Sequence, residues 1–71
     1  MRKLNLPPTP QLQPCKRRIL ELLVQCYSNE DIADTLDLAL STVKNYNGMI
    51  YRTMGFRHRC DAVAWAWKNQ E

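Results

Sequence analysis

The fold is decided by the stretch Ser28-Asn29-Glu30-Asp31-Ile32-Ala33-Asp34-Thr35-Leu36-Asp37-Leu38-Ala39-Leu40-Ser41-Thr42-Val43-Lys44-Asn45, which predicts two helices joined by a tight turn. Ser28 or Asn29 caps the first helix, and two acidic residues follow in its first turn, where the helix dipole favours negative charge. The second helix opens with short polar and basic side chains: Ser41, Thr42, Lys44 and Asn45. Such groups reach base edges and phosphates when the start of a helix enters a major groove.

Charge is distributed unevenly along the chain. Residues 1–40 carry five basic and five acidic side chains, whereas residues 41–71 carry five basic and two acidic ones, so the net charge of +3 lies in the second part. Between Leu38 and Cys60 there are four Lys or Arg residues and no Asp or Glu. This separation predicts an anionic partner for one face of the second part.

The length of 71 residues suffices for one small domain. A domain of this size buries only about 60% of the surface that its unfolded chain exposes, so it often gains stability from a second subunit. A hydrophobic fraction of 45% is typical of globular chains.

Several classes of site are disfavoured by the residue inventory. Cys15, Cys26 and Cys60 show no CxxC spacing and the chain has a single histidine, so we expect no metal site. One histidine, two glycines and no pair of carboxylates on a common face argue against an enzyme, and nothing indicates a cofactor or a small-molecule ligand. Free thiols suit a reducing cytoplasm, and no apolar run approaches the roughly 18 residues of a membrane span.

The remaining pattern predicts an all-α fold. Residues 1–11 contain three prolines and are expected to form a flexible N-terminal arm, with the domain spanning residues 12–71. Apolar residues recur at helical spacing in four segments, which begin near Pro14, Asn29, Leu40 and Arg59 and end near Cys26, Leu36, Met54 and Asn69. We expect the fourth helix to bury Ala62, Val63 and Ala66.

Residues 12 to about 67 resemble the DNA-binding domain of the LuxR/GerE family of bacterial transcription factors. Ser28-Asn29-Glu30-Asp31-Ile32-Ala33 is similar to the "SNKEIA" segment of that family, and Thr42-Val43-Lys44-Asn45 to its "TVKNH" segment. Met54-Gly55-Phe56-Arg57-His58-Arg59 resembles "LGVxxR", and Asp61-Ala62-Val63 resembles "EAV". The resemblance implies a four-helix helix-turn-helix domain of the LuxR/GerE type, with a fourth helix that commonly pairs two subunits.

The chain also departs from the pattern of that family. The family usually has Ser or Thr at three expected N-caps, where this chain has Gln13, Ala39 and His58, and each weak cap costs roughly 0.5–2 kcal/mol. Cys26 replaces a common glycine, which predicts strain if φ is positive there. Lys16 replaces an acidic residue that takes part in an internal ion pair. Most members carry a receiver or ligand-sensing domain before this one.

Eight residues are candidate DNA contacts: Ser41, Thr42, Lys44, Asn45, Tyr46, Gly48, Arg52 and Arg59. Lys44 is expected to contact a base or a phosphate, and Asn45 to pair with adenine, unless it is simply exposed. The other roles stay open. Thr42 donates to a phosphate or caps the helix, Tyr46 binds a phosphate or packs, and each arginine contacts a phosphate or pairs within the domain. Gly48 allows close approach or weakens readout. For Lys16-Arg17-Arg18 a solvated face is favoured.

The fourth helix supplies candidates for a dimer interface. Helical spacing groups Asp61, Trp65 and Lys68 on an outward face, with Ala64 beside them. Trp65 would anchor a partner, and Asp61 would meet Lys68 of an antiparallel helix; the alternative is that Trp65 folds back on its own core.

The sequence therefore predicts a cytoplasmic, sequence-specific regulator of transcription that binds duplex DNA as a homodimer, with the third helix in the major groove. The alternative is a protein-binding inhibitor or cofactor that pairs through its C-terminal helix with a full-length LuxR-type activator.

Overall fold

The computed structural model describes residues 6–69, which form four α-helices: α1 (Pro14–Leu23), α2 (Asn29–Leu36), α3 (Leu40–Met54) and α4 (Arg59–Lys68). No strand is found in this part of the chain. The predicted all-α class with four helices is confirmed. None of the helices in residues 6–69 is long and apolar enough to cross a membrane.

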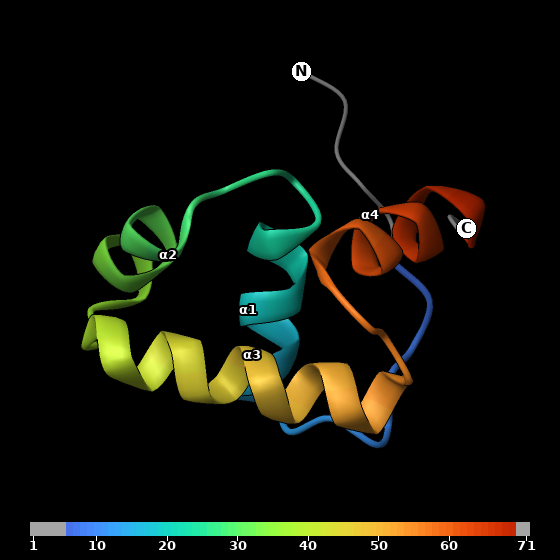
Figure 1. Cartoon of the computed structure of the whole chain (residues 1–71). Helices are drawn as coiled ribbons and strands as arrows, with labels where there is room; N and C mark the ends of the chain where they lie inside the picture. The colour runs from blue at the N-terminus through green and yellow to red at the C-terminus, as the bar shows by residue number, and fades with distance from the viewer. Residues whose placement is uncertain (1–5, 70–71) are drawn as a thin grey trace.

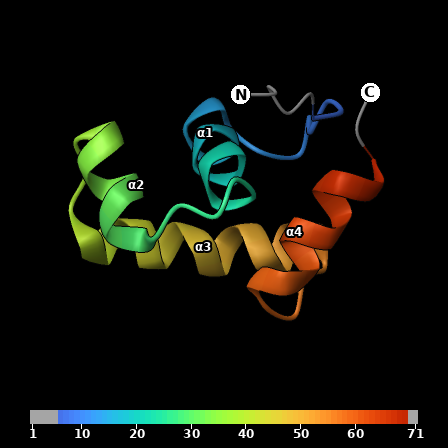
Figure 2. The same ribbon diagram turned by 90° about the horizontal axis from the view of Figure 1, so that it is seen from above.

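Helix α3 is the longest element and extends along one side of the domain (Figure 1). Both α1 and α2 pack on α3, and α4 packs on α1 beside the C-terminal half of α3. The view from above shows α2 and α4 at opposite ends of α3, with α1 between them (Figure 2). The core lies where the four helices meet and consists of Leu12, Ile19, Leu20, Leu23, Val24, Ile32, Ala33, Val43, Ile50, Ala62 and Ala66.

A polar contact also joins α2 to α3. The amide Nδ2 of Asn47 donates to Oδ1 of Asn29 at 2.8 Å, and Asn47 is buried. This hydrogen bond links the two helices, whereas the buried Oδ1 of Asn47 has no hydrogen-bond partner among the described residues.

The ends of α2 explain the tight turn that follows it. The Ser28 side chain accepts a hydrogen bond from the backbone N–H of Asp31 at 3.1 Å, which confirms Ser28 as the N-cap. Asp37 adopts the left-handed conformation, with φ 56°, and the Leu38 N–H donates to the Ala33 carbonyl at 2.8 Å. The chain therefore reverses within three residues and begins α3 at Leu40.

Helix α3 begins without a side-chain cap. Ala39 has the extended backbone of an N-cap, with φ −70° and ψ 146°, but offers no acceptor to the first turn. Gln13 and His58 occupy the N-cap positions of α1 and α4 and likewise make no side-chain cap bond. Three of the four helices therefore start with backbone N–H groups that no N-cap side chain satisfies.

Replacing Ala39 by serine is expected to raise the free energy of unfolding by roughly 0.5–1.5 kcal/mol. The serine hydroxyl would accept a hydrogen bond from the exposed N–H groups at the start of α3. Calorimetry of both proteins measures the gain. Ala39→Val changes the same position without adding a hydrogen-bond acceptor and should give no gain, because valine caps a helix no better than alanine. Equal effects of the two changes would rule out a cap at Ala39.

The loop after α1 contains the expected strain. Cys26 has φ 69°, in the left-handed region that favours glycine, and its N–H donates to the Leu23 carbonyl at 3.1 Å. A non-glycine residue in this conformation costs of order 1 kcal/mol or more. A glycine at this position would adopt the same conformation without this loss of stability.

Part of the predicted arm lies against α1. The Arg17 guanidinium donates to the Pro7 carbonyl at 2.9 Å and to the Thr9 hydroxyl at 2.8 Å, and its Nε lies 3.3 Å from a carboxylate oxygen of Glu21. Thr9 is buried. Residues 1–5 of the predicted arm lie outside the described residues. The boundary between arm and domain at residue 11 stays a prediction.

Candidate nucleic-acid interface

The outward face of α3 brings together most of the predicted contact residues. Ser41, Lys44, Asn45, Gly48 and Arg52 are exposed. They recur at spacings of three and four residues, which places them along one side of the helix, opposite the buried Val43, Asn47 and Ile50. Thr42 and Tyr46 are half-buried at the edge of this face.

The cations on this face form no ion pair with the residues that the structure describes. Among residues 6–69, neither Lys44 nor Arg52 has a carboxylate oxygen within 4.0 Å. Helix α3 itself contains no acidic residue. Both charges are therefore available to an external anion.

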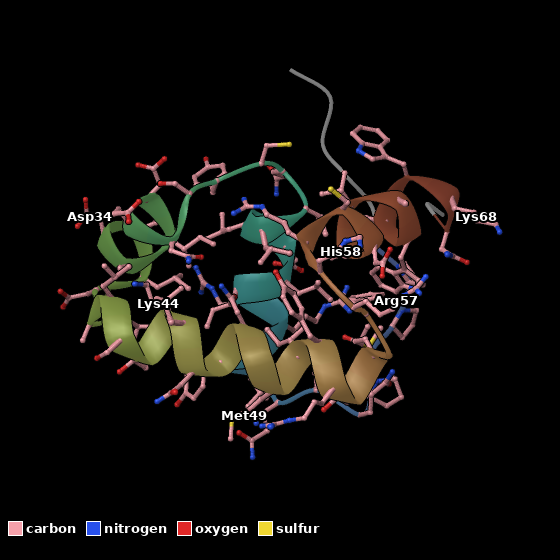
Figure 3. The ribbon with its side chains drawn as sticks, in the orientation of Figure 1. Asp34, Lys44, Met49, Arg57, His58 and Lys68 are labelled. Carbon is pink, nitrogen blue, oxygen red and sulfur yellow. The ribbon has the colours of Figure 1, made fainter. Side chains whose placement is uncertain are left out.

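Acidic side chains gather instead on the preceding helix and its turn. Glu30, Asp31, Asp34 and Asp37 are all exposed. Figure 3 shows Asp34 on α2, apart from Lys44 on α3. The exposed carboxylates of this region therefore lie on α2 and the turn after it, whereas α3 carries only basic charges.

Gly48 lies near the middle of α3 without a steric need for glycine. A Cβ atom at this position would meet no atom within 4 Å. A glycine inside a helix costs about 0.5–1 kcal/mol relative to alanine. Packing inside the domain does not require a glycine here. The absence of a side chain at Gly48 therefore leaves the α3 backbone accessible on the exposed face.

Arg59, also predicted as a DNA contact, lies at the start of α4 and not on this face of α3. Its guanidinium donates to the Leu23 carbonyl at 3.2 Å and to the Tyr27 carbonyl. It therefore binds one carbonyl at the end of α1 and one in the loop that follows, and it holds the start of α4 against this segment. Of the two alternatives for Arg59, the pairing within the domain is the one found.

The prediction of an outward Trp65 is wrong as well. The side chain is half-buried against the core, and its ring centroid lies 5.8 Å from that of Phe56. The exposed tryptophan of α4 is Trp67, which retains 55% of its accessible surface. Ala64 and Lys68 are exposed, as predicted.

Asp61 makes contacts with the residues that precede its own helix. One carboxylate oxygen accepts a hydrogen bond from the Arg57 backbone N–H at 2.9 Å, and the other lies 3.9 Å from Nδ1 of His58. The hydrogen bond from Arg57 lowers the pKa of the Asp61 carboxyl below its ordinary value. This contact stabilises the start of α4, where His58 provides no side-chain cap.

A shallow apolar groove lies beside α4. It is lined by Cys26, Arg59, Cys60, Val63 and Ala64, and its volume is about 440 Å³. Cys60, Ala64 and Trp67 are exposed and lie on one side of the helix because they are spaced by four and three residues. Sequence reasoning missed this 60-64-67 spacing and chose the neighbouring set at 61, 65 and 68.

The family model described as "Bacterial regulatory proteins, luxR family" matches residues 10–66. The chain belongs to this family. The match covers all of α1, α2 and α3 and most of α4, so the resemblance predicted from the segments around Asn29, Lys44 and Gly55 is confirmed. The matched domain is a LuxR-type helix-turn-helix domain, a DNA-binding domain of transcription regulators. The helices α2 and α3 form its motif.

Curated relatives match the same region. The HTH-type transcriptional regulator MalT from two strains of Klebsiella pneumoniae is 41% identical over 68 residues, which cover 87% of this chain and 8% of the relative. MalT from Cronobacter sakazakii is 39% identical over 66 residues, which cover 84% of this chain and 7% of the relative. The chain thus spans less than a tenth of the length of these relatives.

Proposed function

We propose that this chain is a sequence-specific regulator of transcription that binds duplex DNA with α3 in the major groove. The observation that carries the proposal is the exposed face of α3, which offers Ser41, Lys44 and Asn45 at its start and contains no carboxylate. A groove wide enough for a helix and lined by phosphates matches both the shape and the charge of this face. The family membership supports the same reading.

The residues on the exposed face of α3 and at its edge each have a role in this proposal. Lys44 contacts a base edge or a phosphate, and Asn45 pairs with adenine through N6 and N7. Ser41, Thr42 and Arg52 bind phosphates and fix the position of the helix on the duplex. Gly48, which carries no side chain, leaves the α3 backbone open to the groove.

We further propose that two copies pair through α4. The exposed face formed by Cys60, Ala64 and Trp67, with the apolar groove beside it, is the surface that such a pair would cover. Ala64 permits close approach of two helices, and Trp67 is large enough to anchor the contact. A symmetric pair would place two α3 helices on half-sites about 34–36 Å apart.

The same α4 face supports a second candidate function. An apolar, exposed helix face would also fit the C-terminal helix of a full-length LuxR-type activator, and the chain would then act as an inhibitor or cofactor by pairing with it. The acid-free face of α3 distinguishes the two candidates, because pairing alone makes no use of it.

A titration of the full chain into random duplex DNA at several salt concentrations tests the proposal. The logarithm of the binding constant should fall linearly with the logarithm of the salt concentration, with a slope of about −0.9 for each phosphate neutralised. A selected site should then bind more tightly than random sequence. Failure to bind duplex DNA at low salt would contradict the proposal and favour the pairing function.

A further inference from the structure

Helix α3 has two flanks beside its outward face, and only one of them carries a cation of its own. Successive residues turn by about 100° around a helix axis, so Lys44 and Tyr46 lie about 200° apart. Figure 3 shows Lys44 and Met49 on different sides of α3. By the same spacing, Met49 shares the flank of Tyr46. The residues of this second flank are all uncharged: Thr42, Tyr46, Met49 and Thr53.

A cation reaches this second flank from another helix. The ammonium Nζ of Lys16, on α1, lies 5.8 Å from the centroid of the Tyr46 ring. Helices α1 and α3 pack directly against each other, so the fold holds the backbones that carry Lys16 and Tyr46 close together. Among residues 6–69, no carboxylate oxygen lies within 4.0 Å of Lys16. The charge of Lys16 is thus held beside the phenol ring without an anionic partner in the described part of the domain.

We propose that Lys16 and Tyr46 together bind a DNA phosphate, on the flank of α3 opposite Lys44. This inference rests on the proposed binding of α3 in the major groove. The groove is about 12 Å wide and has a phosphate backbone on each side, so a helix inside it meets phosphates on both flanks. The ammonium and the phenol O–H are both hydrogen-bond donors, and phosphate oxygens are acceptors.

The arrangement gives Lys16 a role beyond that of a solvated residue. The contact with the Tyr46 ring already restricts the Lys16 side chain. The side chain therefore loses less conformational entropy on binding than a lysine that is free in solvent. The phenol, half-buried at the edge of α3, stays near the same phosphate. The pair thus supplies, from two helices, the charge that the second flank of α3 lacks.

The salt dependence of DNA binding tests this proposal. Lys16→Gln should reduce the slope of log K against log salt by about 0.9, and should weaken binding to all sequences alike, because a phosphate contact carries no sequence information. Lys16→Arg keeps the charge and should keep the slope. Tyr46→Phe keeps the ring and removes the hydroxyl; it should weaken binding while leaving the slope unchanged.

Arg18→Gln is the matched control, since it removes one exposed positive charge from the same helix. Arg18 lines a surface pocket with Thr35, Leu36 and Leu38, on the side of α1 that faces α2. Its replacement should change the slope much less than Lys16→Gln does. Circular dichroism measures whether each variant retains the helical content of the parent chain.

The outcomes separate this inference from the proposed function. If the parent chain binds DNA and depends on Lys44, but Lys16→Gln leaves the slope unchanged or changes it no more than Arg18→Gln, then the second phosphate contact is wrong and the proposed function stands. If the parent chain does not bind duplex DNA, both are wrong. If Lys16→Gln loses helical content, the test uses Lys16→Arg instead. A folded Lys16→Arg variant with a reduced slope of log K against log salt would overturn the proposal.

Discussion

Lys44→Ala is expected to weaken binding to the best DNA site by about 1–3 kcal/mol if Lys44 contacts a base edge. Lys44 lies in the first half of α3, is exposed and has no carboxylate within 4.0 Å in the described part of the chain. Its charge is therefore available in the part of α3 that we propose enters the groove first. Fluorescence titrations of parent and variant against the same labelled duplex measure the loss.

The pattern of the loss identifies what Lys44 contacts. A base contact predicts reduced discrimination at one position of the site, whereas a phosphate contact predicts an equal loss for every sequence and a smaller salt slope. Arg18→Ala removes the same charge from the exposed surface of α1 and serves as the control. Unchanged affinity of Lys44→Ala for the best site would remove Lys44 from the interface.

Most of the fold was predictable because its signals are local. The apolar period of 3.6 residues locates the four helices, and Ser28 and Gly55 are residues that cap helices through their own backbone or side chain. The end of α3 at Met54 follows from such a signal, because Gly55 adopts the left-handed conformation that ends a helix. The candidate contacts on α3 were predictable for the same reason, since a helix with one buried stripe leaves its other side exposed.

The roles of Arg59 and Trp65 depend on contacts between segments far apart in the chain. Arg59 binds carbonyls more than 30 residues away, at the end of α1 and in the loop after it. In α4, the run Ala62-Val63-Ala64-Trp65-Ala66-Trp67 is apolar on every side, so periodicity does not choose the inward face. In the structure Trp65 packs against the core and lies beside the ring of Phe56, a contact that the sequence pattern of α4 does not indicate. The partner of Lys16 on α3 is likewise a property of how α1 packs, which no local pattern encodes.

Trp67→Glu is expected to produce a folded monomer that keeps weak, non-specific DNA binding and loses most of its specific binding. Trp67 is the exposed tryptophan of α4, with 55% of its surface accessible, and it lies beside Ala64 on the proposed pairing face. A carboxylate there would have to be buried without a partner if two helices paired, which disfavours the dimer. Since one α3 helix reads too few base pairs for high selectivity, specific affinity should fall together with pairing.

Sedimentation of the parent and the variant, with and without the best DNA site, measures the oligomeric state, and a parallel titration measures affinity. Trp65→Glu is the informative contrast. Because Trp65 packs against Phe56 and the core, this change should unfold or strongly destabilise the domain, whereas Trp67→Glu should keep the helical content of the parent. A Trp67→Glu protein that still pairs would place the interface elsewhere on the surface. A parent chain that stays monomeric on its best site would exclude the homodimer altogether and leave α4 free for a different partner.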